Sequence, residues 1–111
     1  MKLTTIIPVH NAEKYITATL DSVFMNTAYF YLTDEGRKLA HKLATAHPGD
    51  IYNKENFKEN LRAGFGKYDS LVCIMATGIV VRILAPLIVH KTSDPAVVVL
   101  DQKGKHAISL L

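Results

Sequence analysis

The feature that most constrains the fold is a near-continuous apolar run, Ser70–Met75, which lies between Asp69 and the short sequence Ala76-Thr77-Gly78. A strand with apolar residues on both faces must be covered on both, and such runs are typical of the centre of a parallel sheet. An apolar segment of helical length, Ile79–Ala85, follows it, and Pro86 ends or kinks that segment. We therefore predict a central parallel strand followed by a helix.

Other strand-like and helix-like segments alternate along the chain. The apolar patterns predict strands over Leu3–Val9, Ala28–Leu32, Asp50–Tyr52, Ala96–Leu100 and His106–Leu111. Helical spacing is found over Ala12–Phe24, between Thr33 and Pro48, and between Asn53 and Gly66. This alternation predicts an α/β fold, with a mostly parallel sheet flanked by helices. Gly104, between the last two strands, predicts a β-hairpin at the C-terminal end.

Capping residues and apolar spacing refine two of these helices. Thr33 or Asp34 is expected to cap the helix that ends before Pro48, and Asn53 to cap the next one. The buried stripe of the first of these helices is expected to comprise Leu39, Ala40, Leu43 and Ala44.

Charge and cysteine content exclude several classes of protein. The 111 residues carry a net charge of +3, and the basic residues are scattered without the stacking-plus-basic motif of nucleic-acid binders. No apolar stretch reaches the roughly 18 residues that span a bilayer. The single cysteine, Cys73, lies within the apolar run and is expected to be a buried thiol. We predict a soluble cytoplasmic protein that binds neither nucleic acid nor membrane, and the sequence leaves the oligomeric state open.

The best candidate site is the Thr77-Gly78 turn after the buried strand. Ligands of open α/β sheets collect beyond the carboxyl ends of the strands, and a helix start there favours an anion. Gly78 would let the backbone approach the ligand, and Thr77 would cap the helix or donate its hydroxyl. Arg82, in an otherwise apolar helix, would pair with a ligand carboxylate or with an internal acid such as Asp69 or Asp94. A simple capped turn is the alternative.

The polar loop before Ala96 is the second candidate. Lys91 would neutralise ligand charge there, although an ordinary solvated loop has the same composition. The five histidines show no metal-ligand spacing, and neither a nucleophile elbow nor a phosphate loop is present. We predict no metal site and no cofactor.

From residue 28 onward the chain resembles the N-terminal domain of CbiG-type cobalamin-biosynthesis proteins, the cobalt-precorrin-5A hydrolases. The resemblance rests on Leu32–Gly36, Ala76–Pro86, Lys91–Val99, Asp101 and Ile108–Leu111, in the family's order and spacing. In that family the last of these segments runs into a loop containing glycine and histidine, so we expect residues 28–111 to be a domain truncated at its C-terminus.

This resemblance implies a role in corrin-ring biosynthesis. The family's reaction is the hydrolytic opening of a ring lactone in a cobalt-corrinoid, with loss of acetaldehyde, which places it among the C–C bond hydrolases. The substrate is an anionic macrocycle bearing acetate and propionate carboxylates. Thr77, Gly78, Arg82 and Lys91 are the substrate-binding residues that suit such a polyanion. The catalytic base stays unknown, with Asp94 as a weak candidate, and we expect the fragment to be inactive alone.

The first residues resemble a different family. Thr5–Ile16 and Leu20–Val23 are similar to the opening βα unit of family 2 glycosyltransferases, whose acidic metal-binding motif this sequence does not contain. We therefore expect residues 1–27 to be a βα segment that is foreign to residues 28–111, as in a chimeric or misread frame, or loosely packed. Two alternatives remain open, which are a non-catalytic α/β binding module and a truncated glycosyltransferase.

Overall fold

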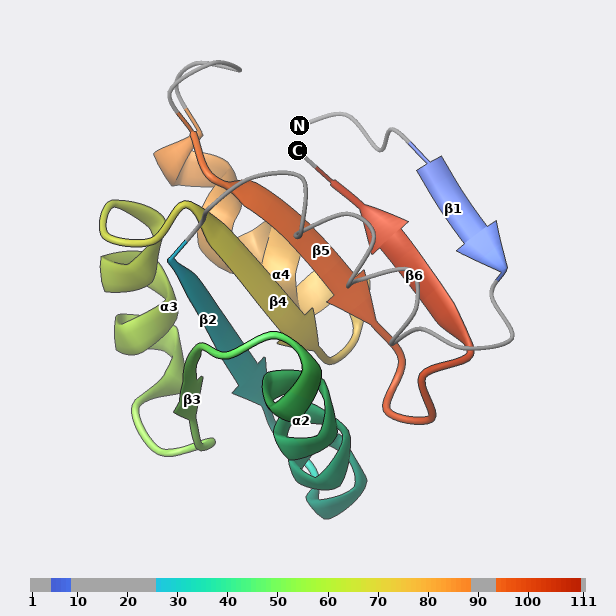
Figure 1. The fold of residues 1–111 in the computed structure, drawn as a ribbon. Coiled ribbons are helices and arrows are strands. Elements are labelled where there is room, and N and C mark those ends of the chain that lie inside the picture. Colours follow the sequence, from blue (N-terminus) through green and yellow to red (C-terminus); the bar gives the residue numbers. More distant parts are fainter. Residues whose placement is uncertain (1–4, 9–25, 89–93, 111) are drawn as a thin grey trace.

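In the computed structural model the chain forms one six-stranded sheet with helices on both faces (Figure 1). The structure describes residues 5–8, 26–88 and 94–110, with the backbone alone for residues 5–8. Its strands are β1 (Thr5–Pro8), β2 (Thr27–Tyr31), β3 (Asp50–Tyr52), β4 (Ser70–Ile74), β5 (Ala96–Leu100) and β6 (His106–Ser109). Its helices are α2 (Asp34–Ala46), α3 (Phe57–Phe65) and α4 (Thr77–Leu84), and a 3₁₀ turn over Ala85–Leu87 follows α4.

The strand order is β1-β6-β5-β4-β2-β3. Strands β3, β2, β4 and β5 run parallel, whereas β6 pairs antiparallel with both β5 and β1. The prediction of a mostly parallel α/β sheet with a C-terminal hairpin is confirmed. Gly104, with φ 71°, takes the left-handed conformation that the hairpin loop requires and that glycine adopts at no steric cost.

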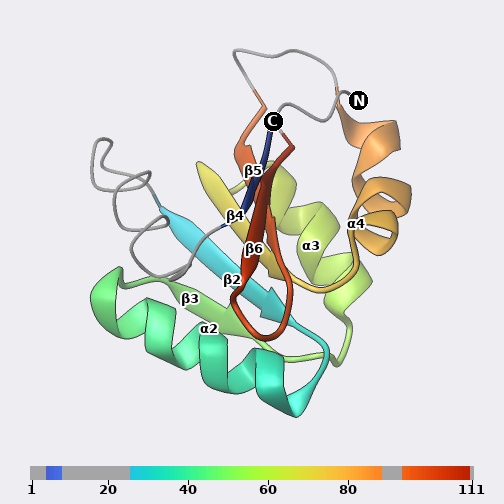
Figure 2. The ribbon, with the colours of Figure 1, turned by 90° about the vertical axis from the view of Figure 1, so that its right-hand side faces the viewer.

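The predicted central strand is confirmed, since all five residues of β4 are buried. Alternate residues of β4 pack into two apolar clusters, one on each face of the sheet. Helices α3 and α4 cover one face and α2 covers the other, as Figure 2 shows. Cys73 faces the α3 and α4 side with no exposed surface, which confirms the buried thiol, and burial raises its pKa to about 12.

The two predicted caps have opposite outcomes. Thr33 caps α2, because its hydroxyl accepts the Gly36 N–H at 3.0 Å. Asn53 as a cap is wrong, since α3 begins only after Asn56, whose φ of 56° turns the chain sharply. The Asn53 side chain instead accepts the Glu55 N–H at 3.0 Å, forming a local turn before the helix.

Aromatic side chains hold β3 against the body of the domain. Tyr52 stacks on Phe30 of β2, with ring centroids 5.0 Å apart. The Tyr52 and Tyr68 hydroxyls lie 2.6 Å apart, and Tyr68 donates to the carboxylate of Asp50 at 2.5 Å. These contacts fix a strand of only three residues, which would otherwise be a weak sheet edge.

Candidate functional site

The parallel strands β2, β4 and β5 end at the same edge of the sheet. Tyr31 pairs with Ile74, and Ile74 pairs with Leu100, so the residues that follow each strand lie side by side. A pocket of about 320 Å³ opens at this edge. Its lining residues are Leu32, Thr33, Ile74, Met75, Ala76, Ile79, Asp101 and Gln102. We call this the edge pocket.

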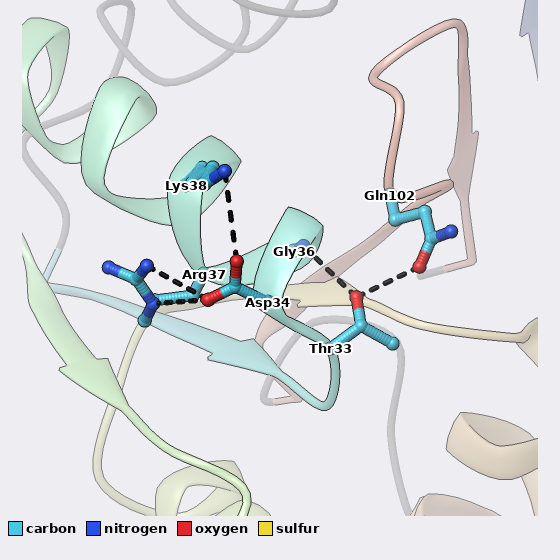
Figure 3. A network of polar contacts seen from close by, with 6 residues as sticks. All are labelled: Thr33, Asp34, Gly36, Arg37, Lys38 and Gln102. Atoms are coloured by element: carbon cyan, nitrogen blue, oxygen red, sulfur yellow. Dashed lines mark hydrogen bonds and ion pairs between the residues drawn. The ribbon is translucent and has the colours of Figure 1, made fainter.

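A hydrogen-bonded link closes one side of the edge pocket. The Thr33 hydroxyl donates to Oε1 of Gln102 at 2.8 Å while it accepts the Gly36 N–H (Figure 3). This bond joins Thr33, which follows β2, to Gln102, which follows β5 and lies 69 positions later in the sequence. The start of α2 and the β5–β6 loop consequently form one wall.

Asp101 shapes the loop that carries Gln102. Its carboxylate accepts the His106 N–H at 2.7 Å, and its carbonyl accepts the Gly104 N–H at 2.9 Å. These bonds hold the loop in a tight hairpin, so that Gln102 is presented at the pocket mouth.

The opposite wall is the beginning of α4. Ala76 is the residue before its first turn, and its carbonyl accepts the Ile79 N–H at 3.1 Å. The prediction that Thr77 caps this helix is wrong, since α4 has no side-chain cap and Thr77 is its first helical residue. The positive end of the helix dipole nevertheless borders the edge pocket, where it favours an acceptor or an anion.

A second depression, of about 270 Å³, lies on the other side of Leu32 and Thr33. Asp34 there accepts two hydrogen bonds from the Arg37 guanidinium, at 3.0 and 2.8 Å, and lies 3.7 Å from the Lys38 ammonium (Figure 3). These contacts with Arg37 hold the pKa of the Asp34 carboxyl below its ordinary range. Asn53, Lys54 and Glu55 complete the rim, which therefore carries both signs of charge.

The matches to known proteins bear on residues from both sides of the edge pocket. Residues 59–111 match the family model described as cobalamin synthesis G N-terminal, and this stretch includes Ala76 and Gln102. The cobalt-precorrin-5A hydrolase of Salmonella typhimurium is 44% identical over 96 residues, covering 76% of this chain. That of Priestia megaterium is 49% identical over 47 residues, covering 42% of it.

This chain contains a segment of the CbiG N-terminal family. It spans 27% of the Salmonella protein and 13% of the Priestia protein. A crystal structure described as a cobalamin biosynthesis protein G homologue from Sulfolobus solfataricus has the same fold, with a TM-score of 0.57 and 25% identity. That likeness covers 70% of this chain and 26% of the solved one. The glycosyltransferase resemblance of residues 1–25 is not borne out by these matches.

Three of the residues predicted to bind substrate, Thr77, Gly78 and Arg82, lie on α4 of this CbiG segment. Gly78 and Arg82 are four residues apart on α4, and both are exposed on its solvent side. No described residue forms an ion pair with Arg82, so neither Asp69 nor Asp94 is its partner. Gly78 has no positive φ, and a Cβ there would meet no atom within 4 Å. The geometry of α4 therefore does not require a glycine at this position.

Most of the second predicted loop falls outside the described residues. Lys91 falls outside the described residues. Asp94 precedes β5, whereas Asp101 follows it, so the seven-residue separation places Asp94 roughly 20 Å from the edge pocket along the strand. No helix of the described residues is long and apolar enough to cross a membrane, and no cluster of possible metal ligands occurs among them.

Sequence reasoning missed Gln102 and Asp101 as pocket residues. It applied the carboxyl-end rule only to β4, although the same rule covers every parallel strand. Thr33 was recognised as a cap, and nothing in its local sequence indicates the link to Gln102. The two residues that follow each of the predicted strands 28–32, 70–75 and 96–100 include half of the pocket lining, which is Thr33, Ala76, Asp101 and Gln102.

Proposed function

We propose that this chain is N-terminal sequence of a cobalt-precorrin-5A hydrolase, and that it binds the anionic cobalt-corrinoid whose ring lactone is opened with release of acetaldehyde. The observation that carries this proposal is the 44% identity over 96 residues to the Salmonella hydrolase. We propose that the protein is cytoplasmic, because its single cysteine is a free buried thiol, as is usual in a reducing compartment.

The geometry supports a binding role for this part of the protein. The edge pocket offers an apolar floor together with hydrogen-bonding groups at its rim, a combination common in small-molecule sites. Lactone hydrolysis also needs an activated water and donors for the developing oxyanion. Because this chain corresponds to about a quarter of the Salmonella protein, we propose that the chain alone binds the corrinoid and does not open its lactone.

Titration with cobyrinic acid, a cobalt-corrinoid with free peripheral carboxylates, tests the binding role. The corrin absorbance and isothermal titration calorimetry should report saturable one-to-one binding that weakens as salt rises, since charge attraction contributes. The chain unfolded in urea serves as the control and should not bind. Absence of saturable binding at low salt would overturn the proposal.

The lactone-bearing substrate tests the second half of the proposal. Incubated with the chain alone it should release no acetaldehyde above the rate of the buffer control, as followed by a coupled alcohol dehydrogenase assay. Catalytic release by the chain alone would show that the machinery for hydrolysis lies within these 111 residues.

A further inference from the structure

The orientation of one amide decides what the edge pocket presents to a ligand. The Thr33 hydroxyl accepts the Gly36 N–H, so its own hydrogen is free to donate, and it donates to Oε1 of Gln102. The side-chain nitrogen of Gln102 points away from Thr33 (Figure 3). Its two N–H groups make no hydrogen bond to Thr33 and are available as donors, and Gln102 is one of the residues that line the pocket.

The rest of the pocket suits a group that combines an oxygen acceptor with apolar surface. Leu32, Ile74, Met75 and Ile79 supply the apolar floor, and the start of α4 faces the same space. Asp101 is the one acidic residue of the lining, and its Oδ1 is engaged by the His106 N–H of its own hairpin. The Gln102 amide on one wall and the start of α4 on the other thus both favour an acceptor in the pocket.

The volume limits the size of the occupant. About 320 Å³ is at the lower end of small-molecule pockets, which run from about 300 to 1,000 Å³. It accommodates a carboxyalkyl side chain and the edge of the ring that bears it, rather than a whole corrin macrocycle.

We propose that the edge pocket receives a peripheral carboxylate arm of the cobalt-corrinoid, and that the Gln102 amide donates a hydrogen bond to it. This inference rests on the proposed function and adds to it the place of contact and the residue responsible. The carboxylate of the ligand is then bound at the edge of the sheet where the parallel strands end, and not on the solvent side of α4, where Arg82 lies.

Gln102→Glu is a sharp test, because it replaces the NH₂ donor by a charged acceptor in a side chain of nearly the same shape. A glutamate oxygen still accepts the Thr33 hydroxyl, so the link between α2 and the β5–β6 loop is kept. The NH₂ group becomes a second carboxylate oxygen, which repels a carboxylate arm. Asn53→Asp is the matched control, since it makes the same change in the neighbouring depression and keeps the acceptor for the Glu55 N–H.

Binding of cobyrinic acid and of cobinamide, whose arms are amides, is measured for each variant. Gln102→Glu should weaken cobyrinic acid binding about tenfold or more, because a hydrogen bond to a charged group is replaced by repulsion. Cobinamide affinity should not fall, because an amide arm can donate to the new carboxylate. Asn53→Asp should stay within about twofold of the unaltered chain for cobyrinic acid.

Three outcomes would overturn the inference while leaving the proposed function in place. Gln102→Glu could bind cobyrinic acid as the unaltered chain does, Asn53→Asp could weaken that binding as much as Gln102→Glu, or cobinamide affinity could fall in parallel. If the unaltered chain binds neither corrinoid, the proposed function fails and this inference with it. Should Gln102→Glu not fold, Gln102→Met removes the donor without adding charge and should weaken cobyrinic acid binding severalfold.

Discussion

At the scale of single residues, Thr33 has two structural roles through one oxygen. Its hydroxyl accepts the Gly36 N–H at the start of α2 and donates to Gln102 across the edge pocket. The first bond follows from local sequence, and the second depends on a residue 69 positions away. A helix cap is therefore also a wall of the candidate site.

Thr33→Ala should lower the free energy of unfolding by about 0.5–2 kcal/mol, the usual cost of losing a threonine cap. Thr45→Ala is the matched control in the same helix, where the exposed hydroxyl donates only to the His41 carbonyl. Thr45→Ala should change the free energy of unfolding by no more than about 0.5 kcal/mol. Urea unfolding followed by circular dichroism measures both, and equal losses in the two variants would contradict the capping role.

Cys73 is a residue whose burial should appear in the pH dependence of stability. Burial raises its thiol pKa from 9.0 to about 12, so the folded state favours the protonated form. The contribution of the protonated Cys73 thiol to the free energy of unfolding is fully present below about pH 9. It is lost as the pH rises from 9 toward 12, because the thiol then ionises in the unfolded chain.

Cys73→Ala should therefore be less stable than the unaltered chain at pH 8, because it leaves a cavity, yet lose less stability between pH 8.5 and 10. Urea unfolding at four pH values over that interval measures the two slopes. Parallel slopes would show that Cys73 ionises equally easily in the folded and unfolded chain.

At the scale of elements, the apolar patterns predict β4 and the buried face of α2 well, because burial alone determines them. Ala40 and Leu43 of the predicted stripe are buried, with Leu39 and Ala44 at its border. Helix starts are predicted less well. Asn53 and Thr77 both have the chemistry of a cap, but the helices begin after Asn56 and Ala76. The left-handed turn at Asn56 and the uncapped start of α4 depend on contacts that a local pattern does not contain.

Helix α4 also yields a prediction about glycine. Gly78 is exposed in its first turn, and an added Cβ would project into open space. Gly78→Ala should raise the free energy of unfolding by up to about 1 kcal/mol, because alanine loses less backbone entropy in a helix.

Gly49→Ala provides the contrast, since its Cβ would lie 2.5 Å from the Thr27 carbonyl oxygen and the backbone would have to shift. It should be destabilising by about 1–3 kcal/mol. Thermal unfolding of both variants measures the signs. A destabilising Gly78→Ala would show that the first turn of α4 needs the glycine after all.

At the scale of the whole molecule, the two apolar clusters of the described residues join all three described helices to the sheet. Every buried apolar residue of the two clusters lies between Ala28 and Leu110. The first residues contribute β1, which pairs only with β6 at the edge of the sheet. The sequence of residues 3–9 predicts a strand, but it does not predict that this strand lies at the edge of the sheet, because that depends on the sheet topology.

A variant that begins at Asn26 should keep the fold and the edge pocket. Its circular dichroism spectrum should retain the helical signal, and its affinity for cobyrinic acid should stay within about twofold. Removal of β1 exposes the edge of β6, so self-association should increase at high concentration, as measured by sedimentation velocity. Loss of cooperative unfolding in this variant would show that residues 1–25 are integral to the domain.

The position of β4 between β2 and β5 has a consequence for the nascent chain. Strand β2 leaves the ribosome first among these three, yet the neighbour that lies between it and β5 is made only about forty residues later. Until Ser70–Ile74 emerges, β2 carries an open edge of aromatic residues, which is the kind of surface that chaperones shield and that other strands capture. The wall formed by Gln102 comes later still. Ligand at this pocket can therefore stabilise only a chain whose sheet has already been synthesised, and cannot assist the earlier steps of its folding.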